Sequence, residues 1–227
     1  MTAIWRPWLV SAAVLVSAGM FAFSARADII DYSINDANTA LSAVSGPYAT
    51  LEVNRTSTTT ATITFTGINN GTDYFLLGGE NVADVNVNAT SWTITSISFA
   101  QLAGFGSVSS SVTSSGAGNV STFGSFNQTT KAFDGFTNSF SSISFVLTDT
   151  SGTWLNAGSV LANNGDEFFG AAHIFVCTDP CSSNQVETAL TGFAAVPAPI
   201  VGAGLPGLIA ACGALIALAR RRRRRIA

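Results

Sequence analysis

Positive charge is scarce in this chain of 227 residues once its two ends are set aside. Between residues 28 and 195, Arg55 and Lys131 are the only cations against 13 acids, which gives that stretch a formal charge of −11. A surface of this sign repels the phosphates of nucleic acids and anionic lipids. We therefore expect no nucleic-acid partner for this part of the chain.

Catalytic motifs are also lacking. A Ser-His-Asp triad would have to use His173, the only histidine, and there is no Gly-x-Ser-x-Gly elbow, phosphate-binding glycine loop or dinucleotide fingerprint. We predict no catalytic residue and no cofactor. A glycan hydrolase stays open as an alternative, because the chain holds enough acids for two carboxylates across a cleft.

Only three cysteines are present. Cys177 and Cys181 flank Thr178-Asp179-Pro180, a turn sequence, whereas Cys212 lies in an apolar run and is expected to act as a small apolar residue. Because exported proteins fold in compartments that oxidise thiols, the sequence predicts a disulfide between Cys177 and Cys181. Closing so short a loop contributes about 2 kcal/mol, so this disulfide would fix a local turn.

The same segment offers a metal site as an alternative. His173, Cys177 and Cys181 follow one another at intervals of four residues, and an imidazole with two thiolates can hold zinc or copper. A fourth ligand is not identifiable. We predict no metal here and interpret His173 as a partly buried strand residue with a hydrogen-bonded ring.

Calcium motifs fail a closer comparison. Residues 84–88 resemble the first half of an EF-hand loop, but Ala89 and Thr95 stand where that loop needs glycine and glutamate. These residues are expected to form a solvated strand face instead. Other oxygen ligands occur without diagnostic spacing at Asp28, Asp31, Asp36 and Asn38, and at Asp166 and Glu167.

Between the two ends, apolar and polar residues alternate with the period of two that is typical of strands with one buried face. The alternation or a denser apolar run is found in residues 60–66, 82–88, 92–99, 143–147 and 171–177. The phase slips within residues 92–99, which predicts a bulge near Thr95 and Ser96. The dense run at 171–177 is suited to a central strand.

Short strands separated by glycine and asparagine turns favour an antiparallel β-sandwich, jelly-roll-like, over an α/β fold. Residues 107–130 are rich in serine and glycine and fit either a strand pair with flexible loops or a flap. We expect one all-β domain over residues 28–195, a length that supports a real core.

The first 27 residues have the pattern of a secretory signal peptide. Arg6 supplies the positive region, residues 8–23 supply the apolar helix, and Ala25 and Ala27 form an A-x-A cleavage site. We therefore expect export through the Sec translocon, cleavage by signal peptidase and a mature chain beginning at Asp28.

The C-terminal end joins three features. A short proline motif consists of Val196, Pro197, Ala198 and Pro199, and residues 200–219 follow it without a single charge. A helix of that length covers about 30 Å, the thickness of a bilayer core. Six arginines follow this apolar run, and a basic cluster beside a membrane span keeps that end of the chain in the cytoplasm. They are Arg220, Arg221, Arg222, Arg223, Arg224 and Arg225.

This tail, residues 196–227, resembles the PEP-CTERM sorting signal of bacterial surface proteins, in a variant with Val-Pro-Ala-Pro in place of Val-Pro-Glu-Pro. The resemblance implies an inner-membrane-anchored precursor, held by a single transmembrane helix until an exosortase, a transpeptidase, processes it near the motif. The protein would then reach the cell surface or the medium. A plain single-span anchor is the alternative for the tail.

We thus predict an exported, non-catalytic surface protein. The resemblance further implies association with extracellular polysaccharide or biofilm matrix. A carbohydrate-binding module is the alternative, in which exposed rings among Tyr74, Phe75, Trp92 and Trp154 would form a flat platform.

Overall fold

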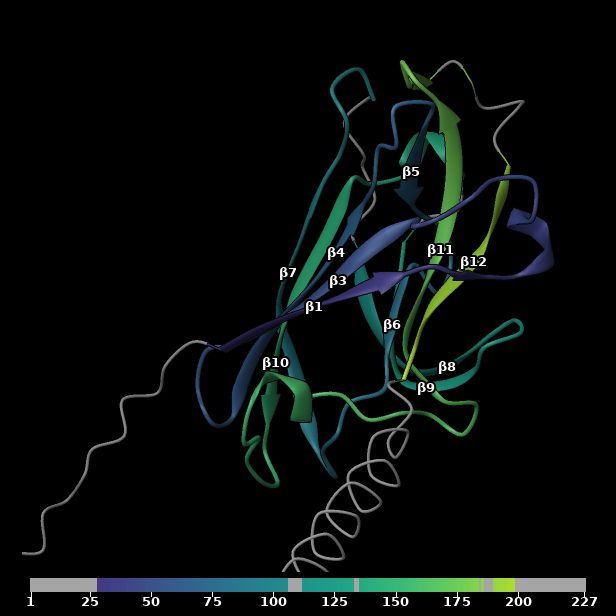
Figure 1. Cartoon of the computed structure of the whole chain (residues 1–227). Helices are drawn as coiled ribbons and strands as arrows, with labels where there is room; N and C mark the ends of the chain where they lie inside the picture. Colours follow the sequence, from purple (N-terminus) through teal and green to yellow (C-terminus); the bar gives the residue numbers. More distant parts are fainter. Residues whose placement is uncertain (1–27, 106–111, 133–134, 184, 186–189, 199–227) are drawn as a thin grey trace, which may run out of the picture.

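The structure, a computed structural model, describes residues 28–105, 112–132, 135–183, 185 and 190–198. Over these residues the chain is all-β and builds two antiparallel sheets that face each other (Figure 1). In chain order the elements are β1 (Asp28–Ile34), β2 (Asp36–Ala37), the 3-10 helix η1 (Thr39–Leu41), β3 (Ala49–Arg55), β4 (Thr60–Gly67), β5 (Asp73–Leu77), β6 (Ala83–Val85), β7 (Trp92–Ala100), β8 (Thr113–Val120), β9 (Gly124–Lys131), η2 (Phe136–Asn138), β10 (Ser142–Asp149), η3 (Ala157–Ser159), β11 (Phe168–Thr178) and β12 (Thr191–Pro197).

The first sheet has the order β1-β3-β4-β10-β7. In β4 the apolar residues are fully buried, and the threonines between them point to the opposite face, as the alternation predicts. β10 pairs with β4 so that Ile143 lies opposite Phe65 and Leu147 lies opposite Ala61. The strands predicted at residues 60–66 and 143–147 are therefore confirmed, and their buried faces form one wall of the core.

The predicted bulge is confirmed on β7. Thr95 pairs with Val146 and Ser98 pairs with Ser144, so two residues of β7 oppose the single residue Phe145. Ser96 takes the extra position with a φ of 54°. Because an inserted residue reverses the side-chain alternation, the bulge lets Trp92 and Phe99 share the inner side of the sheet despite their different parity.

The second sheet has the order β2-β12-β11-β6-β9-β8, and β5 is an additional partner of β11. β11 pairs with β12 along one edge and with β5 and β6 along the other, which confirms the central strand predicted at residues 171–177. Within residues 107–130, β8 and β9 form the strand-pair alternative of the two that the sequence left open.

The main core cluster lies between the sheets and takes residues from both. Phe65, Phe145 and Leu51 enter it from the first sheet, and Ile174 and Val85 enter it from the second. A side-chain hydrogen bond also joins the two sheets: Trp92 Nε1 of β7 donates to Gln128 Oε1 of β9 at 3.0 Å. The observed fold is thus a sandwich-like pair of antiparallel sheets, as predicted.

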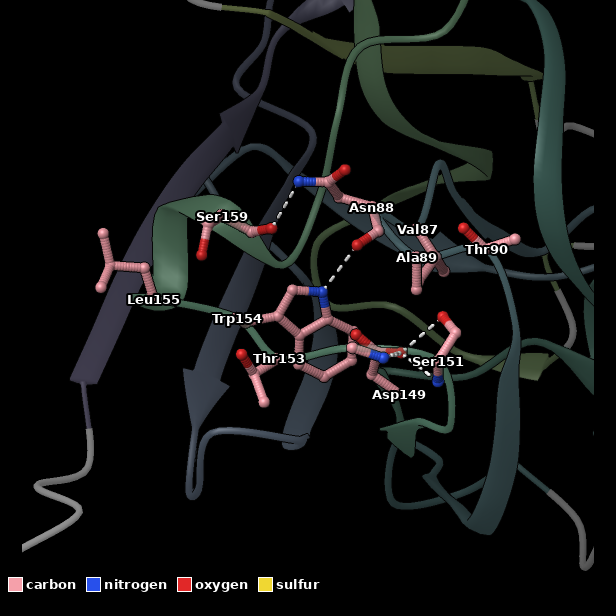
Figure 2. Close-up of a pocket in the computed structure, with 11 residues that line it drawn as sticks. Val87, Asn88, Ala89, Thr90, Asp149, Ser151, Thr153, Trp154, Leu155 and Ser159 are labelled. Carbon is pink, nitrogen blue, oxygen red and sulfur yellow. Dashed lines mark hydrogen bonds between the residues drawn. The ribbon is translucent and has the colours of Figure 1, made fainter.

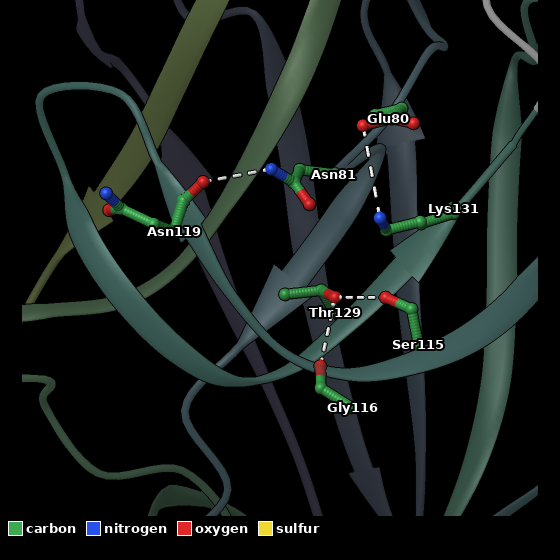
Figure 3. A network of polar contacts seen from close by, with 7 residues as sticks. All are labelled: Glu80, Asn81, Ser115, Gly116, Asn119, Thr129 and Lys131. Carbon is green, nitrogen blue, oxygen red and sulfur yellow. Dashed lines mark hydrogen bonds and ion pairs between the residues drawn. The ribbon is translucent and has the colours of Figure 1, made fainter.

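The outer face of the second sheet is covered in part by the β8–β9 hairpin. Val120, Phe123 and Phe126 of this hairpin region pack on Ala171 and Ala195 of the central strands. Polar contacts hold the hairpin in place, as Figure 3 shows: Thr129 Oγ1 donates to the Gly116 carbonyl at 2.9 Å, Asn81 Nδ2 donates to the Asn119 carbonyl at 3.0 Å, and Lys131 Nζ lies 3.9 Å from Glu80 Oε2.

Asp84 corrects the expectation of a solvated strand face at residues 84–88. Its neighbours Ala83 and Val85 belong to the main core, so Asp84 points to the outer face of the sheet, where the hairpin lies. The residue is 0 % exposed. A side chain that alternation assigns to solvent is here buried, on a short strand enclosed between β11 and β9.

The two predicted export signals lie outside the described residues, with the signal peptide at 1–27 and the span and arginines at 200–225. Among the residues that the structure describes, no helix is long and apolar enough to cross a membrane. β12 runs to Pro197 and so continues across the boundary expected between residues 195 and 196.

Candidate functional site

A pocket of about 530 Å³ opens between two segments that follow the ends of β6 and β10. One segment, residues 87–90, joins β6 to β7; the other, residues 149–159, leads from the end of β10 to η3. Figure 2 shows the lining side chains, which are Val87, Asn88, Ala89, Thr90, Asp149, Ser151, Thr153, Trp154, Leu155 and Ser159. The volume lies within the range of about 300–1,000 Å³ that is common for small-molecule sites.

Trp154 forms the structural base of this pocket. The residue is 3 % exposed and belongs to the main core cluster. Its Nε1 donates to the carbonyl of Asn88 at 2.8 Å, and Asn88 Nδ2 donates to the carbonyl of Ser159 at 2.9 Å (Figure 2). The indole thus ties the 87–90 segment to the 149–159 segment, so the pocket is built on a fixed frame.

Asp149 supplies the carboxylate of the pocket. Its Oδ1 accepts three hydrogen bonds, from Ser151 N at 2.8 Å, Ser151 Oγ at 2.9 Å and Gly152 N at 2.9 Å. Burial acts to raise the pKa of this carboxyl, but the hydrogen bonds from Ser151 and Gly152 stabilise the charged form and hold the pKa below its ordinary value. Asp149 is therefore ionised at neutral pH.

The chemistry of the lining is mostly neutral. Asn88, Thr90 and Thr153 are exposed residues with amide or hydroxyl groups, and the structure places one carboxylate among them. Such a set offers donors and acceptors to a ligand rich in hydroxyl groups. Asp149 is the sole acid among the residues that line this pocket, so the pocket does not supply the pair of carboxylates that glycoside hydrolysis needs.

No family model, curated protein or solved structure matches this chain. The arrangement of its own residues therefore has to support any assignment of function.

The four aromatic rings named for a carbohydrate-binding platform do not form a flat exposed surface. Phe75 is 0 % exposed and Trp154 is 3 % exposed, and both belong to the main core. Tyr74 packs on a smaller cluster with Leu76 and Phe105, and Trp92 packs on the main core. These large rings are used for packing, so a flat stacking surface made from them is a wrong prediction.

The Cys177–Cys181 disulfide is confirmed, with a Cα–Cα distance of 5.4 Å. Since both sulfurs are used in this bond, neither is a thiolate ligand, and the zinc or copper alternative is wrong in that form. His173 Nε2 lies 2.7 Å from Thr191 Oγ1, and its ring stacks on Phe193 with centroids 4.5 Å apart. The interpretation of His173 as a hydrogen-bonded strand residue is confirmed.

The oxygen ligands considered for calcium are not brought together. Asp28 Oδ2 accepts a hydrogen bond from the backbone N–H of Ala157 at 2.7 Å, which ties the start of β1 to η3. Within the part of the chain that the structure describes, no three His, Cys, Asp or Glu residues are grouped as they would be around a metal ion.

The proline motif is partly inside the fold. Val196 and Pro197 are the last residues of β12, and Ala198 follows them directly. Val196 is 2 % exposed and packs in the main core. Pro199, like the signal-peptide alanines Ala25 and Ala27, lies outside the described residues.

Proposed function

We propose that this chain is an exported, non-catalytic surface protein that an exosortase-type transpeptidase processes, and that its sandwich binds extracellular polysaccharide. The observation that carries the binding proposal is the pocket on Trp154, whose lining combines neutral amide and hydroxyl groups with the single carboxylate of Asp149. The sorting proposal rests on the tail of residues 196–227, with its motif, apolar span and arginines.

One structural feature supports export, and two further features bear on the ligand. The Cys177–Cys181 disulfide suits an oxidising compartment such as the cell envelope. The acidic, lysine-poor domain suits a neutral glycan better than a polyanion, because like charges repel. An open pocket with fixed walls also suits the end or a short stretch of a sugar chain.

The sorting proposal predicts a specific mass. In the native host, the protein isolated from the surface or medium is expected to have lost the arginines of its C-terminal tail. This loss is expected to require the transpeptidase gene. Intact-mass analysis of the protein from strains with and without that gene measures both. A mass that retains Arg225 in both strains would overturn the sorting proposal and favour a plain membrane anchor.

The binding proposal predicts that filling the pocket weakens polysaccharide binding. Thr153→Trp places a large ring at an exposed position of the lining and is expected to reduce affinity at least about tenfold, since the sugar and the ring compete for the same volume. Isothermal titration with oligosaccharides from the host's own exopolysaccharide measures this effect.

Ser125→Trp is the matched control, because Ser125 is exposed on β9 and does not line the pocket. This variant is expected to bind as the parent protein does. Equal binding by both variants would place the glycan elsewhere on the molecule. Release of new reducing ends during the titration would instead favour the glycan hydrolase.

A further inference from the structure

The last strand of the sandwich contains the first half of the proposed sorting motif. Within β12, Val196 pairs with Gly170 and Pro197 pairs with Phe168, both on β11. Val196 also packs in the main core, where it is 2 % exposed. The backbone and the side chain at this position are therefore both engaged by the folded domain.

One further contact holds the residue that follows the strand. The backbone N–H of Ala198 donates to the carbonyl of Glu167 at 2.7 Å. Glu167 lies in a tight turn with a φ of 68°, and this turn is fixed by Asn164. Asn164 Oδ1 accepts from the backbone N–H groups of Asp166 and Phe168, each at 3.0 Å, while its Nδ2 donates to the Phe123 carbonyl at 2.8 Å.

Peptidases and transpeptidases bind their substrates as extended strands, over several residues on each side of the bond that breaks. A segment that already pairs with β11 cannot pair with an enzyme at the same time. To present the bonds on either side of Val196, the end of β12 would have to separate from β11 and bring Val196 into water.

We infer that the folded domain shields its own motif up to Ala198, so that the chain is cut only further along, beyond these residues, and the mature domain keeps β12 complete. This inference rests on the proposed sorting function for its enzyme, whereas the shielding rests on the pairing of β12 alone. It assigns the position of processing: the motif residues 196–198 stay with the surface domain, and the apolar span with its arginines is removed.

Limited proteolysis of the full chain in detergent with proteinase K tests the shielding without the host enzyme. The stable fragment is expected to end at Ile200 or later, with at least about tenfold less product ending at Ala194 or Ala195. Bonds before Pro197 and Pro199 resist the protease whether or not the chain is folded, so only these earlier ends report on shielding. A predominant fragment ending at one of these earlier residues would overturn the inference and leave the sorting proposal intact.

A pair of variants separates local shielding from overall stability. Asn164→Ala removes the side chain that fixes the turn carrying the Glu167 carbonyl, and it is expected to raise the fraction of products ending before Ala198. Ser139→Ala removes a buried hydrogen bond of 2.6 Å to the Phe136 carbonyl. Phe136 packs on Phe175, which pairs with the opposite end of β12 from Val196, so this variant is expected to leave that fraction unchanged.

An equal rise in both variants would show that global unfolding controls access, and no rise in Asn164→Ala would show that the turn does not hold the strand end; either result overturns the inference. A C-terminus beyond Ala198 is also expected on the protein from the native host. If the host protein is never cut, the sorting proposal fails, while the proteinase K result still decides the shielding.

Discussion

Replacing Trp154 by alanine is expected to lower the free energy of unfolding by about 3–5 kcal/mol, the range for a large aromatic residue removed from a core. Trp154 is 3 % exposed, so its ring leaves a cavity that the neighbouring strands cannot close completely. The same change removes the donor that ties the Asn88 carbonyl to the 149–159 segment. Chemical denaturation measures the loss of stability, and titration with the oligosaccharides measures the expected loss of binding.

Trp154→Phe is the matched control for this prediction. It keeps an aromatic ring in the core but removes the Nε1 donor, whose net contribution is about 0.5–1.5 kcal/mol. We therefore expect a much smaller loss of stability, together with a looser pocket and weaker binding. A protein that tolerates Trp154→Ala with less than 1 kcal/mol lost would contradict the role of the indole as the base of the pocket.

The arrangement of the first sheet follows from local patterns in the sequence. In β4 and β10 every second residue is apolar, and a strand with one buried face needs no other information to set its orientation. The bulge at Ser96 is predictable for the same reason. The alternation of apolar residues changes parity there, whereas the side of the strand that faces the core stays the same. The disulfide followed from the short separation of Cys177 and Cys181.

The second sheet shows where such patterns are insufficient. Asp84 alternates correctly with Ala83 and Val85, and alternation alone assigns it to solvent. It is buried all the same, on a short strand that lies between β11 and β9, and both of these strands are distant from Asp84 in the sequence. Which outer face receives a second layer depends on long-range packing, and alternation carries no signal for it.

The pocket could not be predicted either, since its walls come from segments about 60 residues apart in the sequence. The turn residues Ser151 and Gly152 after Asp149 are a weak local signal, because an aspartate followed by such residues often accepts their backbone N–H groups. The sequence offers Trp154 as an exposed ring for stacking on a sugar, whereas in the structure the ring is buried beneath the pocket. An exposed stacking ring and a buried ring that supports a pocket look the same in a sequence.

The second large effect is expected at Asp84, where Asp84→Asn should stabilise the folded protein at neutral and higher pH by about 1–3 kcal/mol, because a neutral amide does not incur the desolvation penalty of a buried charge. Among the described residues, none donates a hydrogen bond to either carboxylate oxygen of Asp84. Burial raises the pKa of Asp84 well above its ordinary value, and the polar backbone of Thr130 and the charge of Lys131 offset this only in part.

The sign of the pH dependence follows from that raised pKa. An acid whose pKa is higher in the folded state contributes stability below its unfolded value of 3.8, and this contribution is lost as the pH rises through the folded value. Asparagine does not titrate. The stability of Asp84→Asn minus that of the parent is therefore expected to increase from about pH 4 to pH 8, measured by urea denaturation at each pH.

Asp31→Asn controls for the loss of one negative charge, because Asp31 is exposed on β1. Asp84→Val removes both oxygens without their desolvation cost and, since valine suits a strand, is expected to stabilise the protein as well. If Asp84→Asn follows the pH dependence of the parent, then the ionised carboxylate has a compensating partner. Lys131, two residues beyond the Thr129 that pairs with Asp84, would be that partner, and Lys131→Met would then destabilise the protein strongly.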